Sequence, residues 1–319
     1  MAEQQLPCIR IGHLKVVDHL IIGMSNSRLS ANPSSLKQIQ FESVCLNSWA
    51  QICDGLVTGN LNGAFITLPM AMALFSQGLD LKLIMLTHRS GSIMVTNAKA
   101  GIETIADLQD KSVLVPAKLS VQHMLLHHLL SRAGLELGGM EEPQSQVIRE
   151  DVNPSVMPEM LAMDKDNDVG GFIVSDPFAT AAIGRGDAQK FCATDSLWQN
   201  HPCCGFVLHQ SAIDNHPEAV DELTLHFMES ANRLTQITSP DVLDCAANFL
   251  SQEADIAKIA LIESKINFTP SSLIPEIDTL DRIQTYMSET MGIMTPILDL
   301  NSFLDGDRIA NISEAFIEN

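Results

Sequence analysis

The segment His201-Pro202-Cys203-Cys204 holds the densest group of chemically reactive side chains in this sequence. Imidazole nitrogen and thiolate sulfur are soft ligands, so these residues could bind a metal ion or take part in redox chemistry. A structural metal site needs about four ligands, and adjacent residues rarely all turn toward one ion. We therefore interpret the segment first as a hinge or the wall of a cleft. Contact of His201 with a ligand is the second interpretation. Metal binding by His201, Cys203 or Cys204 stays an open alternative.

A second candidate is a pair of histidines, His123 and His127, which stand four residues apart in an expected helix. That spacing could place two imidazoles on one metal ion, but no acidic residue lies between them as in a metalloprotease motif. Partly exposed helix histidines are the simpler interpretation. The chain also has no phosphate-binding loop, dinucleotide-binding glycine motif or serine nucleophile elbow. We expect no enzyme activity, no catalytic residue and no cofactor.

Charge and composition exclude further classes. The 319 residues include 39 Asp and Glu against 19 Lys and Arg, which gives a formal net charge of −20. Nucleic-acid binding through phosphate contacts needs a basic surface that this chain does not offer. No apolar run approaches the roughly 18–20 residues of a membrane-spanning helix, and the N-terminus has no apolar signal segment. The seven cysteines are scattered and do not indicate a disulfide framework. We expect neither a nucleic-acid partner nor direct membrane insertion.

The first two-thirds of the chain alternates short strand patterns with helix patterns. The expected strands are residues 8–12, 38–42, 62–67, 81–87, 92–96, 112–115, 146–149, 171–174 and 205–209. The expected helices between them are residues 48–58, 69–77, 121–132 and 177–184. This alternation predicts an α/β protein with largely parallel sheets.

From residue 217 onward the pattern becomes helical, with expected helices at 217–234, 240–250, 255–262 and 273–291. Polar stretches near residues 97–107 and 199–204 indicate two crossings between lobes. We therefore predict a discontinuous first lobe, residues 1–96 plus 204–319, and an inserted second lobe, residues 97–203. Two lobes joined by two crossings form a hinge, and small ligands bind in the cleft between such lobes.

Several polar residues follow directly after expected strands, where parallel strands end at one edge of a sheet. They are Asp18 and His19, Thr67, His88, and Asp176. Ser120 is a good N-cap, and the free N–H groups of the helix that it begins would favour an anion. Each of these residues could also be an ordinary helix cap or turn residue. Their convergence on one edge of the sheet is therefore stronger evidence for a binding site than any one residue.

Several stretches together resemble a known family. The specific ones are 49–56 (WAQICDGL) with 59–64 (GNLNGA), and 198–204 (WQNHPCC). Over residues 7–235 the chain resembles the substrate-binding proteins of ABC importers for nitrate, bicarbonate, sulfonates and taurine, to which thiamine-pyrimidine binders are related. The resemblance implies a two-lobed, class II periplasmic-binding-protein fold that closes on a small anionic or zwitterionic ligand. It also implies an ABC permease as partner and an extracytoplasmic location.

By position, the resemblance implies a set of ligand contacts spread over both lobes. They are Asp18, His19, Trp49, Thr67, Leu68, His88, Ser92, Ser120, Gln122, His123, Asp176, Phe178 and His201.

The chain departs from the family pattern in two stretches and in showing no signal segment. Residues 25–35 (SNSRLSANPSS) are expected to form a polar loop where relatives have a helix, and Phe178 stands where many relatives have tryptophan. Two alternative functions remain: a cytoplasmic ligand-sensing module of the same fold, favoured by the free thiols, and an enzyme related to thiamine-pyrimidine synthesis.

Overall fold

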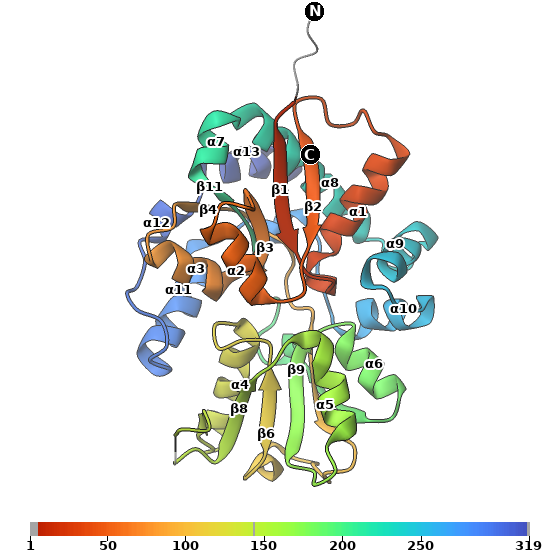
Figure 1. Ribbon diagram of the computed structural model, residues 1–319, viewed down its shortest axis with the longest axis vertical. Coiled ribbons are helices and arrows are strands. Elements are labelled where there is room, and N and C mark those ends of the chain that lie inside the picture. Colours follow the sequence, from red (N-terminus) through yellow and green to blue (C-terminus); the bar gives the residue numbers. More distant parts are fainter. Residues whose placement is uncertain (1–5, 143, 318–319) are drawn as a thin grey trace, which may run out of the picture.

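The computed structural model describes residues 6–142 and 144–317, and its strands form two sheets in two lobes (Figure 1). The first sheet has the strand order β2-β1-β3-β11-β4, and the second has the order β10-β5-β9-β6-β8-β7. Helices pack around both sheets, which confirms the predicted α/β class. Among the described residues, no helix is both long enough and apolar enough to cross a membrane.

The first sheet is mixed. Strands β1 (Cys8–His13), β2 (Gln40–Cys45) and β3 (Gly63–Thr67) are parallel, whereas β11 (Cys204–His209) runs antiparallel to β3 and to β4 (Leu81–Leu86). Because β11 is reversed, its first residues lie at the edge of the sheet where β1 and β4 end. This reversal brings the start of one strand to the ends of two others.

The second sheet contains β5 (Ser92–Asn97), β6 (Ser112–Val115), β7 (Leu137–Gly138), β8 (Val147–Asp151), β9 (Val169–Ser175) and β10 (Ala188–Ala193). Strand β5 lies antiparallel between β10 and β9. Residues 92–96 therefore belong to the second sheet, not to the first lobe as the sequence suggested. The chain crosses before this strand, in the polar segment that precedes it, rather than after it.

Side chains that alternate along β9 separate the helices of the second lobe onto two faces. Phe172 and Val174 share a buried cluster with residues of α5 (Met157–Met163) and α6 (Phe178–Gly184). Ile173 points the other way and joins the main core with residues of α4 (Val121–Arg132). The centre of the sheet is thus covered on both sides, which explains why β5, β6 and β9 are almost completely buried.

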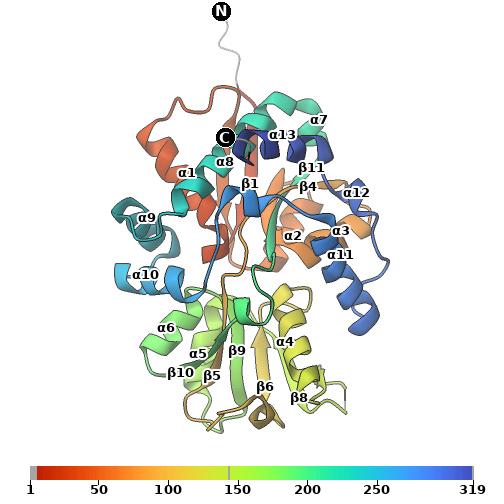
Figure 2. The same ribbon diagram turned by 180° about the vertical axis from the view of Figure 1, so that it is seen from behind.

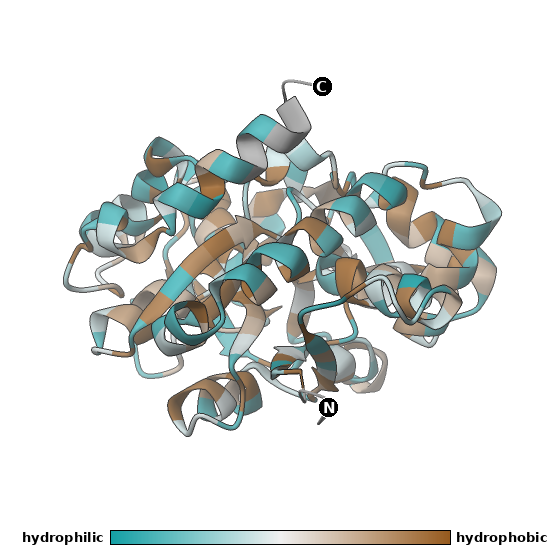
Figure 3. Ribbon diagram, turned by 90° about the horizontal axis from the view of Figure 1, so that it is seen from above, coloured by the Kyte–Doolittle hydropathy of each residue, from teal (hydrophilic) through white to brown (hydrophobic). Residues whose placement is uncertain are grey.

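Helices of the first lobe and the C-terminal part complete the fold. They are α1 (Leu20–Ala31), α2 (Trp49–Val57), α3 (Leu68–Ser76), α7 (Gln210–Asn215), α8 (Pro217–Leu234), α9 (Pro240–Leu250), α10 (Ala254–Glu263), α11 (Ile277–Thr285), α12 (Leu300–Phe303) and α13 (Gly306–Ile317). Seen from above, the outer helices carry both hydrophilic and hydrophobic stretches, as expected for helices with one face on a core (Figure 3).

The lobes are connected at two crossings, near residues 87–91 and 194–203, and Figure 2 shows both from behind, in orange and green. Arg89 in the first crossing pairs with Pro202 in the second and with Asn267 in a third segment. The Arg89 N–H donates to the Asn267 carbonyl at 3.0 Å, and the Asn267 N–H donates to the Arg89 carbonyl at 2.9 Å. The Ser90 N–H donates to the His201 carbonyl at 2.8 Å. The C-terminal part is therefore bonded directly to the hinge.

Two sequence expectations about helices were wrong. The segment 25–35 was expected to be a loop, but Ser25–Ala31 continues α1, because this helix packs against α8 and α9. Residues 273–291 do not form one helix: a 3-10 turn at Pro270–Leu273 precedes α11, and a π-helical turn at Tyr286–Thr290 follows it.

Candidate functional site

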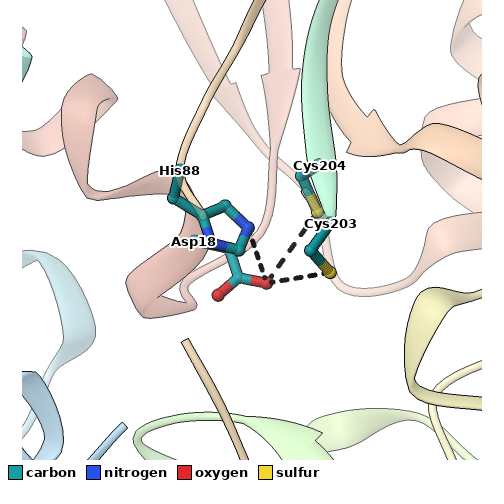
Figure 4. Close-up of side chains that lie close together, drawn as sticks. All are labelled: Asp18, His88, Cys203 and Cys204. Carbon is teal, nitrogen blue, oxygen red and sulfur yellow. Dashed lines mark hydrogen bonds and ion pairs between the residues drawn. The ribbon is translucent and has the colours of Figure 1, made fainter. Parts of the chain in front are cut away.

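Four side chains with metal-binding or nucleophilic chemistry meet where the two lobes join (Figure 4). Asp18 lies in a 3-10 turn, η1 (Val17–His19), that follows β1, and His88 follows β4. Cys203 and Cys204 lie where β11 begins. The strand order explains the meeting, because the ends of β1 and β4 and the start of the reversed β11 share one edge. All four side chains are buried.

The distances within this cluster are short. His88 Nε2 lies 3.3 Å from Asp18 Oδ2, and the Sγ atoms of Cys203 and Cys204 lie 3.9 and 3.8 Å from the same oxygen. One ligand atom from each of the four residues lies within 4.8 Å of all the others. We call Asp18, His88, Cys203 and Cys204 the junction cluster.

The second lobe surrounds the junction cluster with hydroxyl and amide groups. Ser175, at the end of β9, donates a hydrogen bond to Asp18 Oδ2. Gln122 Nε2, in the first turn of α4, donates to Ser92 Oγ at 3.0 Å, Ser175 Oγ at 3.2 Å and Cys203 Sγ at 3.4 Å. These contacts join the lobes through side chains that are themselves buried.

Two further hydrogen bonds hold the lobes together beside the cluster. The Val17 N–H donates to the Asp176 carbonyl at 2.9 Å, and Thr67 Oγ1 donates to the Leu119 carbonyl at 2.9 Å. The arrangement is closed, because strand-end residues of both lobes bond to each other directly.

The environment changes the protonation of the cluster. Burial lowers the pKa of His88, but the negative charge of Asp18 at 3.3 Å outweighs it and raises this pKa to about 10. The neighbouring Cys204 and His88 side chains lower the pKa of the Cys203 thiol despite burial. Burial raises the pKa of the Cys204 thiol well above its ordinary value. His88 is therefore an imidazolium beside a carboxylate and two thiols of unequal acidity.

Several polar atoms of this region are buried without a hydrogen-bond partner among the described residues. They are Asp18 Oδ1, both ring nitrogens of His88, and Gln122 Oε1. An unpaired buried polar atom is costly, so such a group in a folded protein calls for an explanation such as a ligand or an ion.

Of the ligand contacts implied by the sequence, four gather at or next to the cluster: Asp18, His88, Ser92 and Gln122. His19 turns away: its Nδ1 accepts from the Leu14 N–H at 2.9 Å, and its ring packs edge-on against Trp49 and Phe65. Burial lowers the pKa of His19 well below its usual value. His19 and Trp49 therefore pack together in the first lobe.

The remaining implied contacts have structural partners of their own. Ser120 caps α4 by accepting from the His123 N–H at 3.2 Å, and the His123 ring bonds the Lys118 carbonyl at 2.8 Å. His123 and His127 do not share a partner, since His127 bonds the Tyr286 hydroxyl at 2.9 Å. Leu68 is a buried core residue at the start of α3.

Asp176, Phe178 and His201 lie around the hinge but outside the junction cluster. Asp176 accepts from the Thr180 N–H and hydroxyl at 2.9 and 2.8 Å, and burial raises its pKa to about 7. Phe178 begins α6 and packs on the cores half-buried. His201 bonds Thr194 Oγ1 at 2.9 Å, and burial lowers its pKa to about 4.

Sequence reasoning paired the two cysteines with His201, whereas the structure pairs them with His88 and Asp18. It also missed Ser175 as a contact of Asp18, although the next residue, Asp176, was recognised as following a strand. The signal that could have found the set is topological: Asp18, His88 and Cys203 each sit at a strand terminus, and only the strand order shows that these termini share an edge.

Two lobes, each built on a mixed sheet and joined by a double crossing, form a periplasmic-binding-protein fold. The chain belongs to the NMT1-like family, whose profile matches residues 4–251.

Known relatives agree with this fold. The chain is 25% identical over 198 residues to the nitrate/nitrite binding protein NrtA of Nostoc sp., a match that covers 57% of this chain and 44% of that protein. It spans less than half the length of the curated relatives it matches.

Two solved structures are similar over nearly the whole chain. One is the ligand-binding component of an ABC-type import system from Staphylococcus aureus, solved with zinc bound (TM-score 0.83, 18% identity, 96% of this chain and 99% of that chain). The other is the periplasmic nitrate-binding protein NrtA of Synechocystis PCC 6803 (TM-score 0.80, 16% identity, 98% and 89%). At these identities the structural similarity establishes the fold alone.

Proposed function

We propose that this protein is the extracytoplasmic solute-binding component of an ABC importer, which closes its two lobes over a small ligand and delivers it to a permease. The observation that carries the proposal is the contact of buried polar side chains from both lobes at the hinge, above all Gln122 of the second lobe with Cys203 of the first. A ligand that bonds groups of both lobes favours the closed state, which a transporter can recognise.

The proposed ligand is a small anion or zwitterion of the nitrate, bicarbonate, sulfonate or taurine class. The nitrate named for two relatives supports this choice. The first turn of α4 also supports it: Gln122 reaches the junction from this turn, and the free N–H groups of a helix N-terminus favour a negative charge.

Titration calorimetry with nitrate, bicarbonate, taurine and an alkanesulfonate tests the proposal. We expect one of them to bind the native protein, and Gln122→Ala to weaken that binding by about tenfold or more, because it removes an interlobe donor. Gln189→Ala, at an exposed position of β10, is the matched control and should bind like the native protein. Binding that is absent for all four ligands, or equal in both variants, would contradict the proposed site.

A further inference from the structure

The junction cluster has the composition of a metal site. Two thiolates, an imidazole and a carboxylate are the ligand types that Zn²⁺ accepts, usually four at a time in tetrahedral geometry. Mg²⁺ and Ca²⁺ prefer oxygen ligands alone, so this set excludes them as the preferred ions. We infer that Asp18, His88, Cys203 and Cys204 form a buried mononuclear site for a thiolate-preferring metal ion of the Zn²⁺ class.

The separations of the other three ligand atoms from Asp18 Oδ2 fit one ion. In a tetrahedral site with bonds of about 2.0–2.3 Å, ligand atoms are separated by about 3.3–3.8 Å. His88 Nε2 and Asp18 Oδ2 are 3.3 Å apart, and the two sulfurs lie 3.8 and 3.9 Å from that oxygen. Hydrogen bonding contributes little to the two sulfur contacts, because an S–H group is a weak donor at such distances.

The buried polar atoms give an independent reason for an ion. Among the described residues, His88 Nδ1 and Asp18 Oδ1 have no hydrogen-bond partner, and His88 Nε2 has its 3.3 Å ion pair with Asp18 in place of a hydrogen bond, although both side chains are completely buried. A metal ion would occupy Nε2 and would compensate the negative charge of Asp18 and the thiolates, which is costly to bury alone. As the ion enters, the two thiols and the imidazolium lose their protons to solvent, so the four ligands carry three negative charges against two positive charges on the metal.

The second lobe supplies the groups that orient these ligands. Ser175 donates to Asp18, and Gln122 donates to Cys203 Sγ at 3.4 Å. Hydrogen bonds of this kind fix the direction of metal ligands and usually change affinity by about 10–100-fold. Because these donors come from across the hinge, metal binding is coupled to closure of the lobes. The four ligands themselves belong to the first lobe and the crossings, so the site can form whichever solute the protein carries.

The test uses the full-length protein, stripped with a chelator under reducing conditions and titrated with Zn²⁺ and, separately, Co²⁺. We expect one equivalent of metal per chain and a thiolate-to-cobalt charge-transfer absorption band. Cys203→Ser and Cys204→Ser should each weaken Zn²⁺ binding by more than about tenfold and reduce that band. Cys245→Ser, which removes a buried cysteine of α9 far along the chain from the cluster, is the matched control and should leave both unchanged.

A second measurement keeps the inference falsifiable if a serine variant folds poorly. In the native chain, bound Zn²⁺ should protect Cys203 and Cys204 from alkylation after partial unfolding, while Cys8 and Cys45 at the surface react as before. The inference is overturned if the stripped protein takes up no metal, if Co²⁺ binds without a thiolate band, or if Zn²⁺ leaves the alkylation of Cys203 and Cys204 unchanged. These outcomes do not depend on the calorimetric titration with anions, which tests only the proposed transport ligand.

Discussion

His88 Nε2 lies 3.3 Å from Asp18 Oδ2, and neither side chain has any exposed surface. The two residues are far apart in the sequence and meet only because β1 and β4 end at the same edge of the first sheet. A buried charge whose partner is removed is strongly unfavourable, typically by about 3–5 kcal/mol. The pair therefore stabilises the closed junction only when both members are present.

Asp18→Asn should lower the free energy of unfolding of the metal-free protein by about 3 kcal/mol, because it removes the buried ion pair and His88 must then either keep an uncompensated charge or lose its proton. The double variant Asp18→Asn/His88→Asn should cost less than the sum of the two single changes, since no unpaired charge remains. Urea unfolding in the presence of a chelator measures both. Asp54→Asn, at an exposed position of α2, is the control. Strictly additive effects would show that the two side chains do not interact.

Arg89 is expected to be the main polar link between the hinge and the C-terminal segment. Its guanidinium donates to the Ser272 carbonyl, to the Asn200 and Ile274 carbonyls at 3.3 and 3.4 Å, and to Glu276 at 3.2 Å. Arg89→Ala should destabilise the protein by about 2 kcal/mol or more, because it leaves several carbonyl groups without a donor.

Arg89→Lys should restore only part of this loss, because an ammonium cannot reach acceptors in four directions at once. The control is Arg185→Ala, whose pairs with Glu159 and Asp187 are exposed and should contribute less than about 1 kcal/mol. Thermal and urea unfolding of the three variants measure these losses of stability. A loss no larger for Arg89→Ala than for Arg185→Ala would contradict this role.

The sequence predicted most of the regular elements, because their patterns are local. The bounds expected for residues 112–115, 121–132 and 217–234 agree with β6, α4 and α8, where apolar periodicity, the Ser120 cap and Pro217 all act within the segment. Strand β10 was missed, since its polar residues Gln189 and Lys190 hide the strand pattern. Helix α1 was missed as well, and its second half was expected to be a loop, because tertiary packing against α8 and α9 stabilises a polar stretch with no helical pattern of its own.

The site was predicted only in part, because it depends on long-range arrangement and not on local sequence patterns. Strand ends were recognised one at a time, and Asp18 and His88 were found that way, whereas Ser92 and Gln122 were implied only by the family resemblance. Which strand ends share an edge depends on the reversed direction of β11, a long-range feature that no local pattern contains. The partner of the cysteine pair was therefore placed at His201, its neighbour in the chain, instead of at His88.

Stability should rise with pH through the range in which the buried histidines lose their protons. Burial lowers the pKa of His123 to about 4, against an ordinary value of 6.5, and Arg149, His127 and Lys118 nearby oppose its charge further. The unfolded chain therefore binds a proton that the folded chain rejects. The stabilisation, up to about 3 kcal/mol, is complete above about pH 6.5 and is lost as the pH falls toward 4.

His123→Gln should flatten this part of the pH profile of the free energy of unfolding, because glutamine has no proton to gain. His216→Gln, at an exposed position before α8, should leave the slope unchanged. Urea unfolding at several pH values between about 4 and 7 measures the slope. An identical slope in the native protein and His123→Gln would show that His123 is protonated equally in both states. Burial lowers the pKa of His13 to about 4 as well. Part of the pH dependence of the free energy of unfolding should therefore remain in His123→Gln.

The ionisation of Asp176 should make the stability fall as the pH rises, the opposite of the effect of His123. Burial raises its pKa from 3.8 to about 7, although Thr180 donates two hydrogen bonds to it. The folded state then holds a proton that the unfolded chain has released, so this group contributes stability below about pH 4 that is lost as the pH rises toward 7. Asp176→Asn keeps a neutral acceptor for the Thr180 N–H and has nothing to ionise. Relative to the native protein it should therefore gain stability as the pH rises from about 4 to 8, whereas Asp166→Asn, at an exposed position, should show no such trend. A difference between Asp176→Asn and the native protein that stays constant over this range would mean that Asp176 remains ionised in the folded chain.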